Sequence, residues 1–218
     1  ELPKGVTLRK LDEGLDFTLT VALPAEGSAP ADALLAALDE LTENAGPRLN
    51  FVAATEEADL RLAVLPDSPR PDAIWVLPST GLAEDLASTP SVSTADKDGA
   101  ELAATLADTL VTMARAQNLM KLGALVGAGD LDVEVELLTR TPEDRTLKPL
   151  PFAPVPTLLP EDEVHVLARN NTSGPVDVNV LYIGADWSIS HWFSGRLQPG
   201  DELKKGLFKI SADVLGQE

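Results

Sequence analysis

Residues 98–137 read DGAELAATLADTLVTMARAQNLMKLGALVGAGDLDVEVEL, and the spacing of the apolar side chains changes within this stretch. In its first part they recur every three or four positions, at Leu102, Leu106, Leu110 and Met113. That spacing predicts a helix over 98–122 with one apolar stripe, ended by Gly123. In residues 131–137, Leu and Val alternate with Asp and Glu, which is typical of a strand with one apolar and one acidic face. The change of period, which we place near residues 123–130, predicts a passage from a mixed α/β region to a β region.

Upstream of the long helix, short apolar segments are separated by Pro, Gly, Asp and Ser. Alternation within residues 6–23 predicts a strand that ends at Pro24. Leucines at helical spacing over 34–41, followed by Gly46, predict an amphipathic helix. Three further segments are too short for helices and are interpreted as strands, at residues 50–53, 59–65 and 73–77. With the long helix they predict a small α/β domain over residues 1–125, with two main helices and room for a mixed sheet.

Downstream, segments of period two recur with no helix between them. Besides 131–137, we expect strands at residues 164–168, 176–183, 188–193 and 202–210. The connections at 170–175 and 184–186 consist of turn-forming residues, which favours a meander of consecutive strands. This regular spacing predicts an antiparallel, immunoglobulin-like β-sandwich over residues 126–218, and hence an α+β fold for the chain.

The composition argues against several classes of function. The 218 residues include 35 Asp and Glu against 17 Lys and Arg, which gives a formal net charge of −18. Such a chain repels a phosphate backbone, so we expect no nucleic acid as a partner. A partner that docks through charge is expected to be basic and to associate more slowly as the salt concentration rises. The sequence has no cysteine, which removes disulfides, thiolate nucleophiles and Cys-based metal sites.

Targeting signals are also missing from the sequence. No apolar run approaches the roughly 18 residues that a membrane helix needs, and Glu1-Leu2-Pro3-Lys4 lacks the layout of a signal peptide. We therefore expect a soluble chain without a membrane span, and the sequence does not indicate its compartment. Because it begins without Met and ends on what resembles the approach to a strand, we expect it to be a piece of a longer protein.

Candidate catalytic and metal-binding residues are sparse. His165 and His191 are the only histidines, and both lie in alternating strand patterns, so we interpret them as ordinary face residues. No His-Glu-x-x-His spacing occurs, so we expect no metal. The acidic loops 12–16 and 127–132 lack EF-hand spacing, and no glycine-rich phosphate loop occurs, so we expect no cofactor. No Gly-x-Ser-x-Gly elbow exists and we assign no catalytic residue, although a hydrolase that uses paired carboxylates stays open.

Large aromatic residues are concentrated in one expected hairpin, at Tyr182, Trp187, Trp192 and Phe193. Packing on the inner face of a sandwich accounts for most of them. Trp187 and Trp192 differ in parity, however, so in a regular strand they point to opposite faces and at least one lies near the surface. An exposed tryptophan beside Asp186 or Arg196 is a plausible hot spot for a protein or peptide partner. The candidate binding residues are therefore Trp187, Trp192 and Arg196.

Four segments carry a resemblance to a known family: 113–122 (MARAQNLMKL), 161–166 (EDEVHV), 180–183 (VLYI) and 197–201 (LQPGD). Together they resemble the non-catalytic C-terminal half of bacterial caspase-like, metacaspase-type peptidases, where a helix leads into a β-sandwich of the DUF4384 type. The resemblance implies that the catalytic histidine and cysteine of the family belong to a domain upstream of Glu1. No catalytic residue can be carried over, since this chain has no cysteine.

These observations lead to one expected function and its alternatives. We expect an accessory region, not itself an enzyme, of a bacterial caspase-like cysteine peptidase, which recognises partners or substrates or regulates the protease. Its partner is expected to be a protein or peptide, with its own upstream protease domain as one candidate. The alternative is a stand-alone β-sandwich adhesion or carbohydrate-binding module of a secreted or envelope protein.

Overall fold

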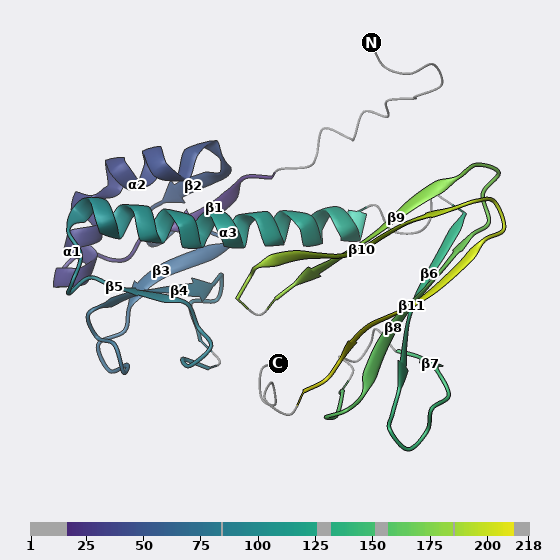
Figure 1. Cartoon of the computed structure of the whole chain (residues 1–218). Helices are drawn as coiled ribbons and strands as arrows, with labels where there is room; N and C mark the ends of the chain where they lie inside the picture. Colours follow the sequence, from purple (N-terminus) through teal and green to yellow (C-terminus); the bar gives the residue numbers. More distant parts are fainter. Residues whose placement is uncertain (1–16, 84, 126–131, 151–156, 185, 212–218) are drawn as a thin grey trace, which may run out of the picture. The chain divides into compact units, whose positions relative to one another are not determined.

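The computed structural model describes residues 17–83, 85–125, 132–150, 157–184 and 186–211 (Figure 1). The chain divides into two compact units, Glu1–Arg115 and Ala116–Glu218, and the division falls within the longest helix, α3 (Gly99–Leu125). Part of the first predicted strand (6–16), the acidic loop 12–16 and all but Asp132 of the loop 127–132 lie outside the described residues.

The first unit is built around a mixed five-stranded sheet. Before α3 its elements are β1 (Leu19–Ala22), α1 (Ala29–Ala36), α2 (Leu38–Ala45), a 3-10 turn (Gly46–Arg48), β2 (Leu49–Val52), β3 (Leu60–Val64), β4 (Ala73–Pro78) and β5 (Ser91–Ser93). The strand order is β2-β1-β3-β4-β5, and β1 runs parallel to β2 and β3. The pairs β3–β4 and β4–β5 are antiparallel. Sequence-based strands therefore agree with β2, β3 and β4 to within a residue, whereas β5 is too short to show a period.

Apolar side chains of the strands and helices form the core of this unit. The predicted stripe of α3 is buried, with Leu102, Leu106 and Leu110 at most 1% exposed. Every residue from Ala73 to Leu77 in β4 is buried as well, which explains why that segment is apolar throughout instead of alternating. α1 contacts β3 and β4, and α2 contacts β2.

The predicted helix over 34–41 is two helices, because the chain leaves helical geometry at Ala37 (φ −99°, ψ 12°). Leu34 and Leu41, one on each side of the break, are both fully buried, so the apolar spacing continues across it. Alanine is the best helix former, and the sequence therefore gives no sign of this break. The predicted stop is confirmed: α2 ends at Ala45, and Gly46 follows with a φ of 62°.

The second unit contains two antiparallel sheets in a sandwich-like arrangement, which makes the fold α+β (Figure 1). Its strands are β6 (Val133–Arg140), β7 (Lys148–Pro149), β8 (Glu163–Asn170), β9 (Val176–Ile183), β10 (Ile189–Leu197) and β11 (Glu202–Lys209). One sheet has the order β11-β8-β6-β7, and β9 and β10 form the other. The alternation predicted β8, β9 and β11 closely, and it underestimated the length of β10 by four residues at its end.

The predicted meander of three consecutive strands is wrong, because β8 pairs with β6 and β11, whereas β9 and β10 pair with each other. The chain changes sheet at Asn170, whose side chain is completely buried. Its Nδ2 donates to the main-chain oxygens of Gly174 (2.8 Å) and Leu197 (3.1 Å), and its Oδ1 accepts from the hydroxyl of Thr172 (2.7 Å). This asparagine links the β8–β9 connection to the end of β10. An alternating pattern identifies a strand but not the strand with which it pairs.

No helix in the part of the chain that the structure describes is long and apolar enough to cross a membrane.

Candidate protein-binding hairpin

Aromatic rings from the β9–β10 hairpin pack against the facing sheet. The rings of Tyr182 and Trp192 stack with their centroids 4.6 Å apart and their planes inclined by 15°. Phe208 of β11 meets the Trp192 ring edge-on at 5.2 Å and the Tyr182 ring at 6.1 Å. Aromatic pairs at such distances contribute about 0.5–1.5 kcal/mol beyond the area they bury. The cluster therefore fixes the hairpin on the four-stranded sheet, although neither Tyr182 nor Trp192 is buried.

A β-bulge explains how both Trp192 and Phe193 reach the same sheet. His191 pairs with Leu181 and Phe193 pairs with Val180, so Trp192 has no partner on β9. Trp192 meets Phe208, as described above, and Lys205 Nζ of β11 lies 5.7 Å from the centroid of the Phe193 ring. The parity argument for the two tryptophans assumed one regular strand and fails for this reason. It fails also because Trp187 precedes β10, which begins at Ile189.

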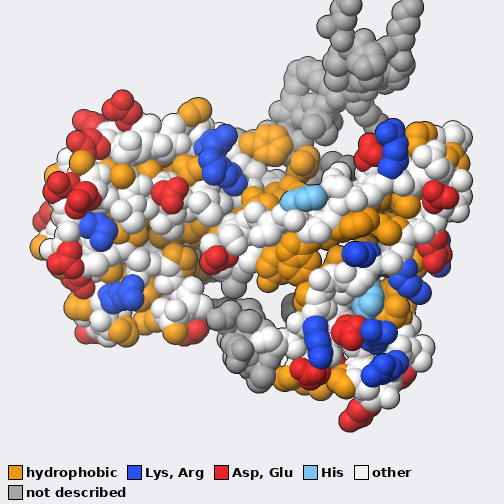
Figure 2. Space-filling model, viewed as in Figure 1, with side chains coloured by type: hydrophobic (Ala, Val, Ile, Leu, Met, Phe, Trp, Pro, Cys, Tyr) orange, Lys and Arg blue, Asp and Glu red, His pale blue; other side chains and the backbone are white. Residues whose placement is uncertain are grey.

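Four large apolar side chains of the hairpin remain exposed to solvent. Tyr182 and Trp192 are 41% and 37% exposed, and Leu181 and Ile189 are 45% and 42% exposed. We call these four residues the hairpin patch. Figure 2 shows hydrophobic side chains gathered over β9 and β10. Leu181 and Ile189 lie on one face of the hairpin, and Tyr182 and Trp192, whose rings stack, lie on the other. Single exposed apolar residues are ordinary, but the hairpin exposes two on each face.

The three tryptophans of the chain differ in whether the indole N–H donates a hydrogen bond to a described residue. Trp75 in β4 is 2% exposed, and its Nε1 donates to the main-chain oxygen of Arg70 at 3.3 Å. Trp187 is half-buried and Trp192 is exposed, and neither indole N–H donates to a described residue. A buried tryptophan usually finds an acceptor for this group. Trp75 is therefore a core residue, whereas the other two keep a donor available.

The turn between β9 and β10 holds Trp187 in an unusual backbone conformation. Its φ is 65°, in the left-handed region. The Gly184 N–H donates to the Ser188 oxygen, and the Trp187 N–H donates to the Gly184 oxygen, both at 2.9 Å. The Asp186 carboxylate accepts from the hydroxyl (2.7 Å) and the backbone N–H (3.1 Å) of Ser188. These bonds lower the pKa of Asp186 below its ordinary value, so the turn carries a negative charge beside Trp187 at neutral pH.

Arg196 lies outside the hairpin patch. It pairs with Asp177 across the hairpin, and its Nε is 3.7 Å from the Asp177 carboxylate, with both side chains more than 60% exposed. It lies four positions after Trp192 along the strand, which corresponds to about 13 Å. Trp187 lies five positions from Trp192 in the other direction along the chain, and among the described residues no hydrogen bond or ring contact joins any two of the three predicted binding residues.

The bulge also creates a polar group that the sequence did not reveal. His191 Nε2 lies 2.7 Å from Ser194 Oγ, which donates to Asn179 Oδ1 at 2.8 Å. A serine hydroxyl has one hydrogen, and because Asn179 accepts it, His191 is the donor to Ser194. The imidazole is therefore not placed to remove the proton of the serine, as a general base must. The three side chains instead form an exposed hydrogen-bonding surface next to the hairpin patch.

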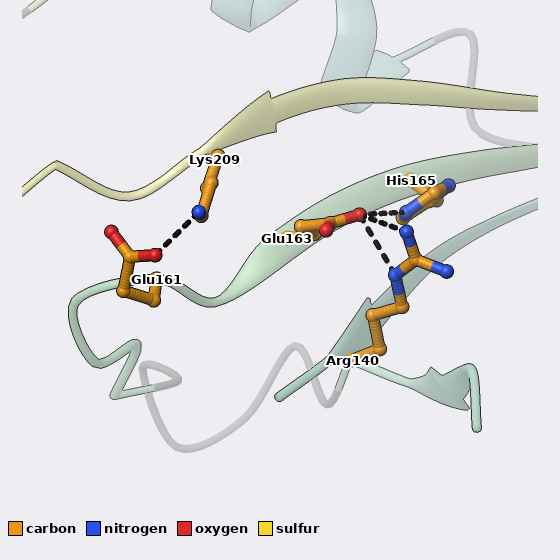
Figure 3. Close-up of polar contacts among 5 residues, drawn as sticks. All are labelled: Arg140, Glu161, Glu163, His165 and Lys209. Carbon is orange, nitrogen blue, oxygen red and sulfur yellow. Dashed lines mark hydrogen bonds and ion pairs between the residues drawn. The ribbon is translucent and has the colours of Figure 1, made fainter. Parts of the chain in front are cut away.

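His165, the other histidine, belongs to a charged cluster on β6 and β8 (Figure 3). Glu163 Oε2 accepts from Arg140 Nε at 2.8 Å and forms an ion pair with Arg140 Nη2 at 2.5 Å. His165 Nε2 approaches the same oxygen at 3.3 Å. The Arg140 guanidinium, and to a lesser extent His165, hold the pKa of Glu163 below its ordinary value. Gly206 leaves room for the imidazole, since a Cβ there would lie 3.3 Å from the ring.

This cluster stabilises the pairing of β6 with β8, because Arg140, Glu163 and His165 form hydrogen bonds and ion pairs with one another. Lys209 and Glu161 form a further ion pair in the same part of the sheet (Figure 3). Arg169 links three strands, with Nη1 2.9 Å from Glu134 on β6 and Nε 2.7 Å from Glu202 on β11. Among the described residues, no group of three His, Cys, Asp or Glu side chains is arranged to hold a metal ion.

The first unit contains a cavity of about 360 Å³ beyond the end of β1. Leu23, Ser28, Arg61 and Val64 contribute to its walls. The guanidinium of Arg61 donates to the main-chain oxygens of Ala54, Glu56 and Ser79, each at 2.8 Å. Its hydrogen bonds join the β2–β3 loop to the loop that follows β4, so this cation stabilises the fold.

Comparisons with known proteins leave the family open. No family model matches the sequence, no curated protein matches it, and no solved structure matches the fold.

Proposed function

We propose that this chain is a non-catalytic accessory region of a bacterial caspase-like cysteine peptidase, and that the hairpin patch is the surface with which it binds a protein partner. The observation that carries the binding role is the exposure of Leu181, Tyr182, Ile189 and Trp192 on one hairpin. The peptidase context is supported by the four sequence segments that resemble that family. The absence of cysteine means that any thiol nucleophile belongs to another part of the protein.

The hairpin patch has the composition of an interface hot spot. Trp and Tyr are the residues most often found at the centre of protein interfaces, where the loss of one costs about 2 kcal/mol or more. The stack on Phe208 holds the Tyr182 and Trp192 rings in place before binding, which lowers the entropy cost of association. The His191–Ser194–Asn179 group beside the patch offers polar contacts for its rim.

The charge of the chain restricts the chemistry of the partner. Residues 1–115 carry a net charge of −12 and residues 116–218 one of −6. A second copy of this chain would meet like charge on both units, which disfavours self-association. We therefore expect a partner with a basic surface, such as the peptidase domain of the same polypeptide or a basic segment of a substrate.

The first experiment asks whether the peptidase domain exists. The native protein is captured from its source cells with an antibody to this chain, and its intact mass and the peptides upstream of Glu1 are determined. A larger chain that contains a catalytic domain with histidine and cysteine is expected. A native mass near the 23.0 kDa of this chain would contradict the proposal. It would favour a stand-alone adhesion or carbohydrate-binding module, which a glycan array would then test.

The second experiment measures binding between the separately produced peptidase domain and this chain by isothermal titration calorimetry. Replacing Trp192 with Ser is expected to weaken binding about 30-fold, the equivalent of about 2 kcal/mol. Leu82→Ser is the matched control, because Leu82 is 72% exposed in the first unit and lies outside the hairpin. Equal affinities for the two variants would show that the hairpin patch is not the contact.

A further inference from the structure

Trp187 has a backbone conformation that a bulky side chain normally avoids. Its φ of 65° is favourable for glycine, whereas a side chain with a Cβ destabilises the fold there. The described residues with positive φ are four glycines, at positions 27, 46, 81 and 200, and two residues with a side chain, Glu161 and Trp187. The chain therefore uses glycine at several turns that need this geometry. At the tip of the hairpin it has a tryptophan instead.

The side chain of Trp187 is half-buried, so packing covers part of the indole and leaves the rest in contact with solvent. The indole N–H of Trp187 donates to no described residue, and no described ring stacks on it. Trp75, in contrast, is buried and donates to Arg70. The turn itself is held by Gly184, Asp186 and Ser188 through bonds that do not involve the indole. Strained residues persist where the surrounding structure fixes them, and they are concentrated at functional sites.

We propose that Trp187 is the specificity-determining anchor of the hairpin, inserted into an apolar pocket of a protein partner that has a basic side chain at the pocket rim. The indole supplies a large rigid surface and a hydrogen-bond donor, and the carboxylate of Asp186 beside it selects the basic side chain. This inference rests on the proposed binding role of the hairpin, but it does not require the partner to be a peptidase.

The test uses a phage-displayed library of random twelve-residue peptides, selected on the full chain. The affinities of the enriched peptides are then measured for the wild type and for Trp187→Ala, Trp187→Gly and Trp187→Phe. The Ala and Gly variants are expected to lose about tenfold or more in affinity, and Phe to lose less because it keeps a ring. Asp186→Asn is expected to weaken the basic peptides, and more so at low salt than at high salt.

Urea unfolding of the same variants separates an anchor from a packing residue. Gly relieves the unfavourable φ, so Trp187→Gly is expected to unfold at a higher urea concentration than the wild type, while it loses binding. A lower midpoint for the Gly variant would show that Trp187 packs in the fold and would overturn the inference. Selected peptides that bind all variants equally, or a selection without enrichment, would also overturn it. Peptide binding that depends on Trp187, in a protein that has no peptidase domain, would reject the proposed peptidase context but keep the anchor.

Discussion

Replacing Asn170 with Ala is expected to destabilise the second unit by about 2–4 kcal/mol. The side chain is completely buried and makes four hydrogen bonds. The bond to Leu197 is fully buried, and the bonds to Gly174 and Thr172 are partly buried. Each such bond contributes about 0.5–1.5 kcal/mol net, and water compensates in part for the three partly buried ones. The four contributions together give the expected loss of about 2–4 kcal/mol, and the cavity left by the shorter alanine side chain adds a small further cost.

The Asp variant makes the same prediction sharper. Asn170→Asp replaces the Nδ2 donor with an oxygen that faces the carbonyl oxygens of Gly174 and Leu197. At neutral pH it is therefore expected to destabilise more than Ala does, and it should recover in acid, where the protonated carboxyl group donates again. Urea unfolding is followed by fluorescence in a Trp75→Phe background, so that emission comes only from the second unit. A cost for Ala below about 1 kcal/mol, or an Asp variant as stable as Ala at neutral pH, would refute this reasoning.

Three further predictions concern the same unit. Phe208→Ala removes the ring that contacts Tyr182 and Trp192 and should lower the free energy of unfolding by about 2–3 kcal/mol, measured by thermal unfolding. Tryptophan emission should shift to the red, and an unshifted spectrum would count against the packing of Trp192 on Phe208. Gly195→Ala places a Cβ 2.8 Å from the Phe193 ring, so chemical shifts of that ring should move, and unchanged shifts would contradict the contact. The Arg140 contact depresses the pKa of Glu163 below 4.5, so its stabilisation is present above pH 4.5 and is lost as the pH falls through the folded-state pKa. In Glu163→Gln the free energy of unfolding should therefore fall less steeply as the pH is lowered. An acid profile like that of the wild type would show that the Arg140–Glu163 ion pair does not stabilise the fold.

The sequence predicted elements where local pattern and burial agree. β9 begins and ends at the predicted residues, because its alternation is unbroken from Val176 to Ile183. The long helix begins within a residue of its prediction, where the Asp98 side chain accepts the backbone N–H of Glu101 at 2.9 Å. Its predicted end at Gly123 is wrong, because α3 continues to Leu125. In both elements the structure is determined by neighbouring residues, the alternation within β9 and the capping aspartate of α3, so the sequence pattern is enough to predict it.

Other features depend on contacts that no local pattern contains. The break at Ala37 leaves the leucine spacing intact, and the change of sheet at Asn170 depends on Leu197, which is 27 residues away. The ion pair between Arg140 of β6 and Glu163 of β8 could not be predicted either, because the two residues are 23 positions apart in the sequence. The candidate binding residues illustrate both cases. The parity argument placed at least one of Trp187 and Trp192 near the surface, and Trp192 is exposed, but the bulge that orients it and the distance of Arg196 from it are products of the strand register.

The hairpin departs from local structural rules more than once within a few residues. Trp187 takes a φ suited to glycine, Trp192 is left without a cross-strand partner, and four large apolar side chains are exposed. Each departure reduces the stability of an isolated hairpin, since two-stranded sheets are marginal even when regular. Elsewhere such departures are scattered: Glu161 has a φ of 75°, and Leu82 and Leu159 are exposed at separate places in the chain. Violations that accumulate in one place are expected where binding, rather than folding, determines the residues. This argues that Trp187→Gly, which removes one violation, should raise stability and lower affinity together, whereas an ordinary surface turn would show no such opposition.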